Sequence, residues 1–233
     1  MSTLRKLLFF FLALVILGAG GCSQTEISEQ KQPTIQTLLQ SAEQGDANAQ
    51  FNLGVMYDSG EGVPQDDKEA LKWYRMAADQ GDVNAQLHLA LRYERGIGVP
   101  TDHKEAAKWV RKAADQGHVE AQYLVGRGYS KGIGVPQDYK EAVKWYLKAA
   151  EQGNSDAQYS LGLMYQRGDG VPRDLLPAYM WLNLALSNST SESLREEYRK
   201  DLYKLEKYLI QVKPELIFEA QQRSREWKPK EKN

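Results

Sequence analysis

The sequence contains one cysteine, Cys22, and three histidines among its 233 residues. A single cysteine cannot form a disulfide within the chain, so the fold must be held together by packing and hydrogen bonds. The histidines, His88, His103 and His118, lie 15 residues apart, and none has another histidine three or four positions away. This spacing argues against a zinc site on one helix face. We therefore expect neither a metal nor another cofactor.

Signals of catalysis are also scarce. The H-E-x-x-H string of helical metalloproteases is absent. Glu69, Glu105 and Glu141 are candidate acids, but each lies three residues after an aspartate and three before a lysine. Such spacing is typical of helix caps and surface ion pairs. We expect no activated nucleophile and no acid–base pair, and thus a protein that is not an enzyme.

The sequence has little excess of one charge sign. Residues 1–21 hold two basic and no acidic residues, and the rest of the chain carries 28 Lys and Arg against 31 Asp and Glu. Proteins that bind nucleic acid usually carry a basic excess that pairs with phosphates. Nucleic acid is therefore not an expected partner.

The longest apolar run is short. It spans the 11 residues from Leu7 to Leu17, whereas a membrane-spanning helix needs roughly 20. Arg5 and Lys6 precede this run, and the small residues 18–21 follow it. This is the layout of a cleavable signal peptide, so we expect residues 1–21 to be removed.

The only cysteine stands directly after these small residues. The string Ala19-Gly20-Gly21-Cys22 resembles the lipobox of bacterial lipoproteins, although that family usually has leucine where Ala19 stands. The resemblance implies that Cys22 is acylated and that acyl chains hold the protein in a membrane. The following Ser23 resembles a sorting signal for the outer membrane, facing either the periplasm or the cell surface. Residues 22–32 would then form a lipidated flexible tether.

Beyond this segment the sequence repeats itself every 36 residues. The recurring positions are Gly45, Gly81, Gly117 and Gly153; Ala49, Ala85, Ala121 and Ala157; Pro64, Pro100, Pro136 and Pro172; and Trp73, Trp109, Trp145 and Trp181. Such a period is typical of solenoids, whose units are helical hairpins stacked on one another. Each proline ends a G-x-G-V-P string, which we interpret as the turn inside a hairpin, since proline lacks the amide of a phosphate-binding loop.

Each unit is expected to contain two helices. The first buries positions spaced by four, as in Ala49, Leu53 and Tyr57. The second buries the recurring tryptophan, so that the four tryptophans form a core ladder. A glycine inside a helix costs up to about 1 kcal/mol. The recurring small residue at Gly54, Ala90, Gly126 and Gly162 therefore predicts a close helix contact.

The helix ends carry their own signals. Asp66, Asp102 and Asp138 each precede a glutamate by three residues, which predicts a capping box at the start of the second helix. The recurring glycines predict a left-handed residue where the second helix ends, and Asp46, Asp82 and Asn154 can cap the next helix. His118 stands at that position in the third repeat and is the weakest of these caps.

Segments on both sides of the repeats are expected to cap the stack. Residues 35–43 align with the end of a second helix and would cover the first repeat. A further amphipathic helix follows the last repeat, and Pro214 opens a final helix towards Trp227; the apolar stripe of the former comprises Leu194, Tyr198, Leu202, Leu205 and Leu209. We expect a repeat domain over 33–188, capping helices over 189–227 and a disordered tail over 228–233.

The strings A-x-A-Q, L-G-x-x-Y, G-x-G-V-P-x-D and A-x-K-W-Y at the 36-residue step resemble the Sel-one-like repeat (SLR) family, which is related to tetratricopeptide repeats. The resemblance implies an all-α fold, a right-handed superhelix of helical hairpins that serves as a scaffold for protein partners. Some family members are envelope lipoproteins. A cysteine-rich branch is associated with β-lactams, but its paired cysteines are absent here. A cell-envelope hydrolase acting on peptidoglycan or β-lactams remains the alternative.

By the same resemblance, partners would bind along one stripe of the first helices. The expected binding residues are Asn48, Phe51, Val55, Leu91, Arg95, Tyr123, Arg127, Lys131, Tyr159, Leu163 and Arg167. Arg95, Lys131 and Arg167 share one position of the repeat and would form a basic rail beside aromatic side chains. This pattern favours an extended protein or peptide ligand with acidic groups. The alternative is that the charges are a solvated face and the aromatic residues belong to the core.

Overall fold

The structure is a computed structural model, and it describes residues 35–229. The expected signal peptide over residues 1–21, the lipidation site Cys22 and the tether over residues 22–32 lie outside the described residues, as do residues 230–233.

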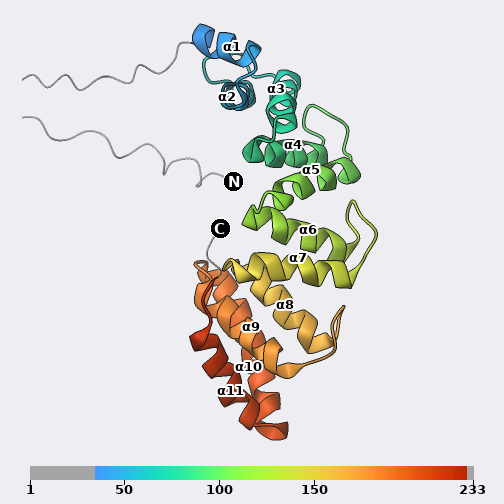
Figure 1. Cartoon of the computed structure of the whole chain (residues 1–233), viewed down its shortest axis with the longest axis vertical. Helices are drawn as coiled ribbons and strands as arrows, with labels where there is room; N and C mark the ends of the chain where they lie inside the picture. Colours follow the sequence, from blue (N-terminus) through green and yellow to red (C-terminus); the bar gives the residue numbers. More distant parts are fainter. Residues whose placement is uncertain (1–34, 230–233) are drawn as a thin grey trace, which may run out of the picture. The chain divides into compact units, whose positions relative to one another are not determined.

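The described residues form helices and no strands (Figure 1). The helices are α1 (Ile35–Glu43), α2 (Ala47–Ser59), α3 (Asp67–Asp79), α4 (Val83–Arg95), α5 (His103–Asp115), α6 (Val119–Lys131), α7 (Tyr139–Glu151), α8 (Ser155–Arg167), α9 (Leu175–Asn188), α10 (Glu192–Val212) and α11 (Glu215–Glu226). The pairs α2–α3, α4–α5, α6–α7 and α8–α9 each make one hairpin, and every hairpin packs against the next. The expected solenoid of four helical hairpins is confirmed. Within the described residues no helix is both long and apolar enough to span a membrane.

The hairpin core is built on the recurring tryptophans, as expected. All four are 3–6% exposed. Cationic side chains cover the ring faces: Lys112 Nζ lies 3.7 Å from the ring centre of Trp109, and the Arg111 guanidinium lies 4.4 Å from that of Trp145. The long aliphatic stems of these side chains therefore shield the ladder from solvent while their charges stay hydrated.

The predicted close contact at the small first-helix position is confirmed. A Cβ atom at Gly54 would lie 2.6 Å from the ring of Tyr74, and one at Gly126 would lie 2.6 Å from the ring of Tyr146. The second repeat has alanine at this position, Ala90, and the facing residue there is the smaller Val110. The methyl group of Ala90 replaces only part of the volume that Val110 lacks relative to tyrosine, because both residues line a cavity.

The capping prediction is correct for one half of each box. The carboxylate of Asp66 accepts hydrogen bonds from the amides of Lys68 (2.9 Å) and Glu69 (3.1 Å). The other half, a hydrogen bond from the Asp66 amide to the Glu69 side chain, is wrong, because the Asp66 amide donates to the Tyr57 carbonyl oxygen. Glu69 pairs with Lys72 instead, and the next two repeats show the same arrangement. The expected surface ion pair is therefore present in all three.

The second helices end as predicted. Gly81 has φ of 98°, which places it in the left-handed region, and the amide of Asp82 donates to the Ala77 carbonyl across it. Such a turn reverses the chain within a few residues. His118 does serve as a cap, because its Nδ1 accepts from the Ala121 amide at 3.2 Å.

A ladder of buried glutamines, not predicted from the sequence, joins the repeats. Gln86 donates to the carbonyl of Ala78 at the end of α3 (3.2 Å) and accepts from Gln116 at the end of α5 (3.0 Å). The corresponding glutamine binds in the same way in the other repeats, at Gln50, Gln122 and Gln158. Each glutamine satisfies a buried helix end and links it to the next hairpin.

The flanking helices cover the first and the last hairpin of the array. α1 packs on α2 and buries Ala42. Both α10 and α11 pack on α9, and α10 buries Tyr198, Leu202, Leu205 and Leu209, while Leu194 remains half-buried.

Candidate binding surface

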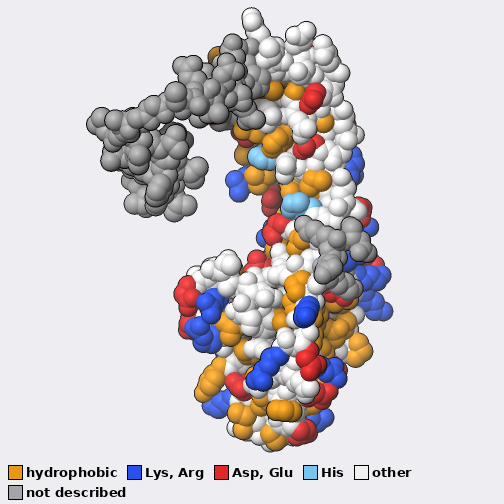
Figure 2. Space-filling model, turned by 60° about the vertical axis from the view of Figure 1, so that its left-hand side comes forward, with side chains coloured by type: hydrophobic (Ala, Val, Ile, Leu, Met, Phe, Trp, Pro, Cys, Tyr) orange, Lys and Arg blue, Asp and Glu red, His pale blue; other side chains and the backbone are white. Residues whose placement is uncertain are grey.

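The first-helix stripe predicted for partner binding lies along α2, α4, α6 and α8, and its residues are in two distinct situations. In the first three repeats much of it is open: Val55 and Leu91 are 38% and 36% exposed, and Asn48, Arg95 and Lys131 are exposed as well. Figure 2 shows hydrophobic side chains and histidine together on the surface of the upper part of the array.

The aromatic residues of the open stripe, Phe51 and Tyr123, are half-buried. Each ring therefore belongs partly to the core and partly to the expected binding surface. Phe51 contacts Tyr74 with ring centres 5.8 Å apart and meets His88 edge-on at 5.5 Å. His88 stacks on Tyr74 at 4.9 Å. In the third repeat Tyr123 lies 5.8 Å from Tyr146. The inner faces of these rings belong to the hairpin core, and their outer edges contribute to the surface.

A buried arginine beneath the stripe was not expected. Arg92 is 2% exposed. Its guanidinium binds the carboxylate of Asp58 at 2.5 Å and the carbonyl oxygen of Asp67 at 3.1 Å, and lies 5.4 Å from the ring centre of Tyr74. This network joins the first two hairpins. The buried charge is tolerated because Nη1 and Nη2 both contact acceptor oxygens and the Tyr74 ring lies beside the guanidinium.

Burial shifts the pKa values of two side chains beside this network, Tyr74 and His88. It raises the pKa of Tyr74, and the Asp58 carboxylate adds to the rise. It lowers the pKa of His88, and the Arg92 cation opposes protonation further, while Asp58 and Asp82 act in the opposite direction. Both side chains are therefore held in their neutral forms.

In the fourth repeat the stripe is covered by α10. Tyr159 stacks on Tyr198 with ring centres 4.4 Å apart, and its hydroxyl donates to Asp201 at 2.7 Å. The hydroxyl of Tyr198 donates to Asp156 in return, and Leu163 packs into the α9–α10 cluster. The expectation that the stripe is open along all four repeats is wrong at Tyr159 and Leu163. The reason is that α10 turns back from α9 onto α8 and does not extend the stack.

The basic rail is present in the fold, with one qualification for the fourth repeat. Arg95, Lys131 and Arg167 are the last residues of α4, α6 and α8, and all three are exposed. Cations at helix C-termini are also favoured by the helix dipole. Arg167 lies near Asp201 of α10: burial raises the pKa of that carboxyl, but hydrogen bonds from Lys204 and Tyr159 and the charges of Lys204 and Arg167 lower it overall. Within the described residues Arg95 and Lys131, in the second and third repeats, form no ion pair, and their binding role stays a prediction. Arg127, one turn away, hydrogen-bonds Tyr123.

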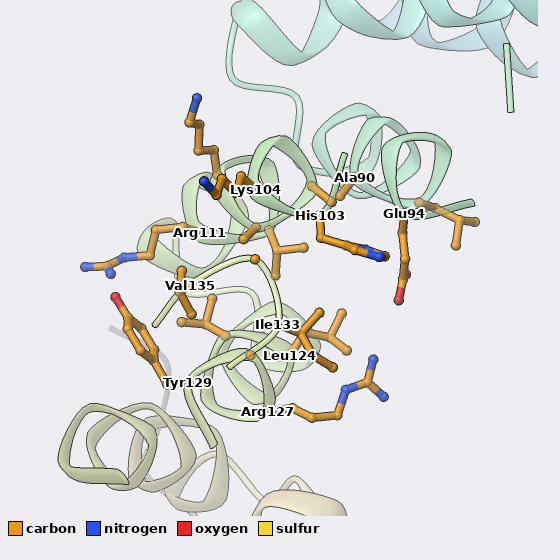
Figure 3. Close-up of a pocket in the computed structure, with 18 of the residues that line it drawn as sticks. Ala90, Glu94, His103, Lys104, Arg111, Leu124, Arg127, Tyr129, Ile133 and Val135 are labelled. Atoms are coloured by element: carbon orange, nitrogen blue, oxygen red, sulfur yellow. The ribbon is translucent and has the colours of Figure 1, made fainter. Parts of the chain in front are cut away.

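Between the second and third repeats the stripe opens into a cavity of about 720 Å³ (Figure 3). Its lining includes the predicted stripe residues Leu91 and Arg127. Figure 3 places Arg111 and Tyr129 at one end of the cavity and Glu94, His103 and Arg127 at the other. No comparable feature was predicted.

One string in the sequence matches the nucleophile motif of hydrolases, although no activated nucleophile was expected. The string from Gly128 to Gly132 reads G-x-S-x-G around Ser130. The serine of a nucleophile elbow lies on a sharp turn between a strand and a helix, whereas Ser130 lies in the last turn of α6 and hydrogen-bonds Tyr146. The string therefore forms the C-terminal end of α6, where Gly132 caps the helix. The described residues also contain no group of three or more His, Cys, Asp or Glu side chains that could hold a metal ion.

Comparisons with known proteins agree with this architecture. The family model described as Sel1 repeat matches residues 47–82, 83–118, 119–154 and 155–189. The chain is similar to a solved protective antigen of uropathogenic Escherichia coli strains that displays an SLR fold (42% identity, TM-score 0.63, covering 68% of this chain and 34% of that one). It is also similar to a Sel1 repeat protein from Oxalobacter formigenes (38% identity, TM-score 0.62, covering 66% and 63%).

This chain thus spans about a third of the first of these proteins and less than two thirds of the second. No curated protein matches it. The four matched repeats cover more than half of the residues and coincide with the four hairpins, and the chain belongs to the Sel1 repeat family.

Proposed function

We propose that this protein is a non-catalytic scaffold of the bacterial cell envelope, anchored as an outer-membrane lipoprotein, which binds an acidic segment of a partner protein along the open first-helix stripe of repeats one to three. Sel1 repeat proteins are typically protein-interaction scaffolds, and the coarse function follows from membership of the family. The position of the binding surface, the acidic character of the ligand and the anchor are the specific parts of the proposal.

The observation that carries the proposal is the packing of α10 on the fourth repeat. There the stripe binds a helix of the same chain through a stacked tyrosine pair and through hydroxyl–carboxylate bonds in both directions. The same positions in the third repeat hold Tyr123 and Glu120, with Lys131 at the rail. Those side chains can offer a partner the same stacking and hydrogen bonding, and the rail adds attraction for carboxylates.

The binding surface is tested by charge reversal. The variant Arg95→Glu with Lys131→Glu changes the open rail, and Lys68→Glu with Lys140→Glu is a matched control, because these exposed lysines lie on the second helices α3 and α7. Arg167 is left intact because it faces α10. We expect chemical crosslinking in cell envelopes, followed by purification, to recover a partner with wild type and control and much less of it with the rail variant. Equal recovery from all three would reject the rail.

The anchor rests on the sequence around Cys22, and it has its own test. Mass spectrometry of the mature N-terminus should find residues 1–21 removed and Cys22 acylated, and Cys22→Ser should leave the chain unprocessed or released from the outer membrane. An unmodified Cys22 behind an intact leader would refute the anchor without affecting the binding surface.

A further inference from the structure

The cavity between repeats two and three exists because two positions of the repeat carry unusually small residues there. On the second helix, Val110 stands where the first and third repeats have Tyr74 and Tyr146. On the first helix, Gly128 stands where the other repeats have larger side chains, namely Met56, Arg92 and Met164. Both small residues line the cavity.

The preceding junction shows what these larger residues do. Between repeats one and two, Arg92 reaches the carbonyl oxygens of Asp67 (3.1 Å) and Ile97 (3.4 Å) and lies against Tyr74. One repeat later, the residues at the positions of Asp67 and Ile97 are His103 and Ile133, and both line the cavity. The cavity therefore occupies the space that a side chain at position 128 would fill.

The walls and the rim differ in chemistry. The walls carry aliphatic side chains from both hairpins, including Leu87, Leu91, Leu124, Ile133 and Val135. Leu91 and Ile133 are 36% and 46% exposed. The charged residues of the rim comprise four cations, Lys104, Lys108, Arg111 and Arg127, and two anions, Glu94 and Glu120. Lys108 and Arg111 already pair with Glu105 and Asp115 of α5, so Lys104 and Arg127 are the rim cations that form no ion pair within the described residues. An apolar interior beside these two cations is complementary to an apolar group that carries acidic neighbours.

We infer that this cavity is the anchor pocket of the scaffold, which takes one large apolar side chain, aromatic or leucine, from a partner segment whose adjacent acidic residues pair with the cations of the rim. The inference rests on the proposed function and adds the residue type that the partner inserts. An anchor side chain of this kind usually supplies much of the affinity of an interface, because a well-packed pocket excludes water around it. The cavity is contiguous with the stripe through Leu91 and Arg127, so a single segment can occupy both.

The test fills the pocket with the residue that other repeats carry. Gly128→Met reproduces the first and fourth repeats, which accommodate this side chain against the same G-x-G-V-P turn; the Ile133 carbonyl oxygen, 3.3 Å from the added Cβ, must give slightly. Asn52→Met is the matched control, since it adds the same side chain at an exposed position of α2. A second filling variant, Ala90→Gly with Val110→Tyr, copies the residue pair of the first and third repeats.

The probes are two short peptides of Gly, Ser and Asp, one with a single central Trp and one with Ala in its place, titrated into the full chain and followed by amide NMR shifts. We expect the Trp peptide to shift residues around the cavity and to bind wild type and Asn52→Met about tenfold or more tighter than the Ala peptide. Both filling variants should lose this preference while their melting temperatures stay at or above that of wild type.

Three results would overturn the inference. They are equal binding of the two peptides to wild type, an unchanged preference in both folded filling variants, or saturation of the cavity by a free fatty acid with no response to the Trp peptide. If the filling variants still recover the envelope partner but the rail variant does not, the scaffold stands and the anchor pocket fails.

Discussion

The fourth repeat and the first three share one framework and differ in what covers it. All four carry the buried tryptophan and the glutamine link; the left-handed glycine that ends the second helix in the first three is replaced by Ser189, in extended conformation, in the fourth. Only in the fourth does α10 lie on the first-helix stripe. The framework thus determines how hairpins stack, whereas the stripe determines what the hairpins bind, and the two can change independently from repeat to repeat.

The covered repeat also indicates what the open repeats lack. Asp156 and Tyr159 each bond a group on α10. Their counterparts, Glu120 and Tyr123, are the most similar pair in the open region, while the first two repeats have Asn48 with Phe51 and Asn84 with Leu87. A partner that uses the same chemistry as α10 would therefore bind the third repeat first, next to α10 and beside the cavity.

The largest expected effect is a loss of stability when a buried tryptophan is removed next to the boundary between the open repeats and the covered fourth repeat. Trp145 is 3% exposed and packs with Ala113, Ala121 and Val125. Trp145→Ala should reduce the free energy of unfolding by roughly 3–5 kcal/mol, as other large-to-small aromatic changes do. Urea unfolding followed by circular dichroism measures this. A midpoint equal to that of wild type would mean that the ladder contributes little to either region.

The framework could be predicted from the sequence because repetition shows it directly. Trp109 or Gly54 alone is ambiguous, but the same residue type at four successive units constrains its environment. The 36-residue step of Gln86 could have revealed the glutamine ladder in the same way. Features that depart from the repeat were missed. The pattern of α10 shows which residues it buries and not which surface receives them.

Arg92 and the cavity were missed for a related reason. Each results from one repeat carrying an exceptional residue at a position where methionine is the usual filler. The consequence of Gly128 becomes visible only when the space left by its missing side chain is seen between two hairpins.

A second effect tests whether the open and covered regions have equally tight cores. An added Cβ lies 2.6 Å from Tyr146 at Gly126 and 2.6 Å from Leu182 at Gly162. Either Gly→Ala change should destabilise by about 1–2 kcal/mol, because overpacking costs more than the gain in helix propensity. Ala90→Gly is the control, and it should cost about 1 kcal/mol in helix propensity in addition to the contacts of its buried methyl group. Thermal unfolding of the three variants provides the comparison, and a stabilised Gly126→Ala variant would contradict the close contact.

A smaller effect is expected from loosening the cover of the fourth repeat. Tyr198→Phe keeps the ring stack on Tyr159 but removes the hydroxyl that donates to Asp156. We expect a loss of about 1 kcal/mol, the usual net value of one hydrogen bond. Amide hydrogen exchange should accelerate in α10 and leave α4 and α6 unchanged. Faster exchange along the whole array would instead show that α10 stabilises all repeats.

The smallest expected effect is a pH dependence confined to the open region. Burial lowers the pKa of His88 below its ordinary value of 6.5, so between the native pKa and 6.5 the unfolded chain binds more protons than the folded one. Stability should therefore be fully present above pH 6.5 and decline as the pH falls through this window.

His88→Leu places the residue of the third repeat at this position and removes the titration. The difference in melting temperature between about pH 7.5 and about pH 5.5 should be smaller in this variant than in wild type. Because His88 contacts Phe51 and Tyr74 and nothing on α10, Tyr198→Phe should leave that pH difference unchanged; a changed difference would link the covered repeat to the aromatic cluster of the first.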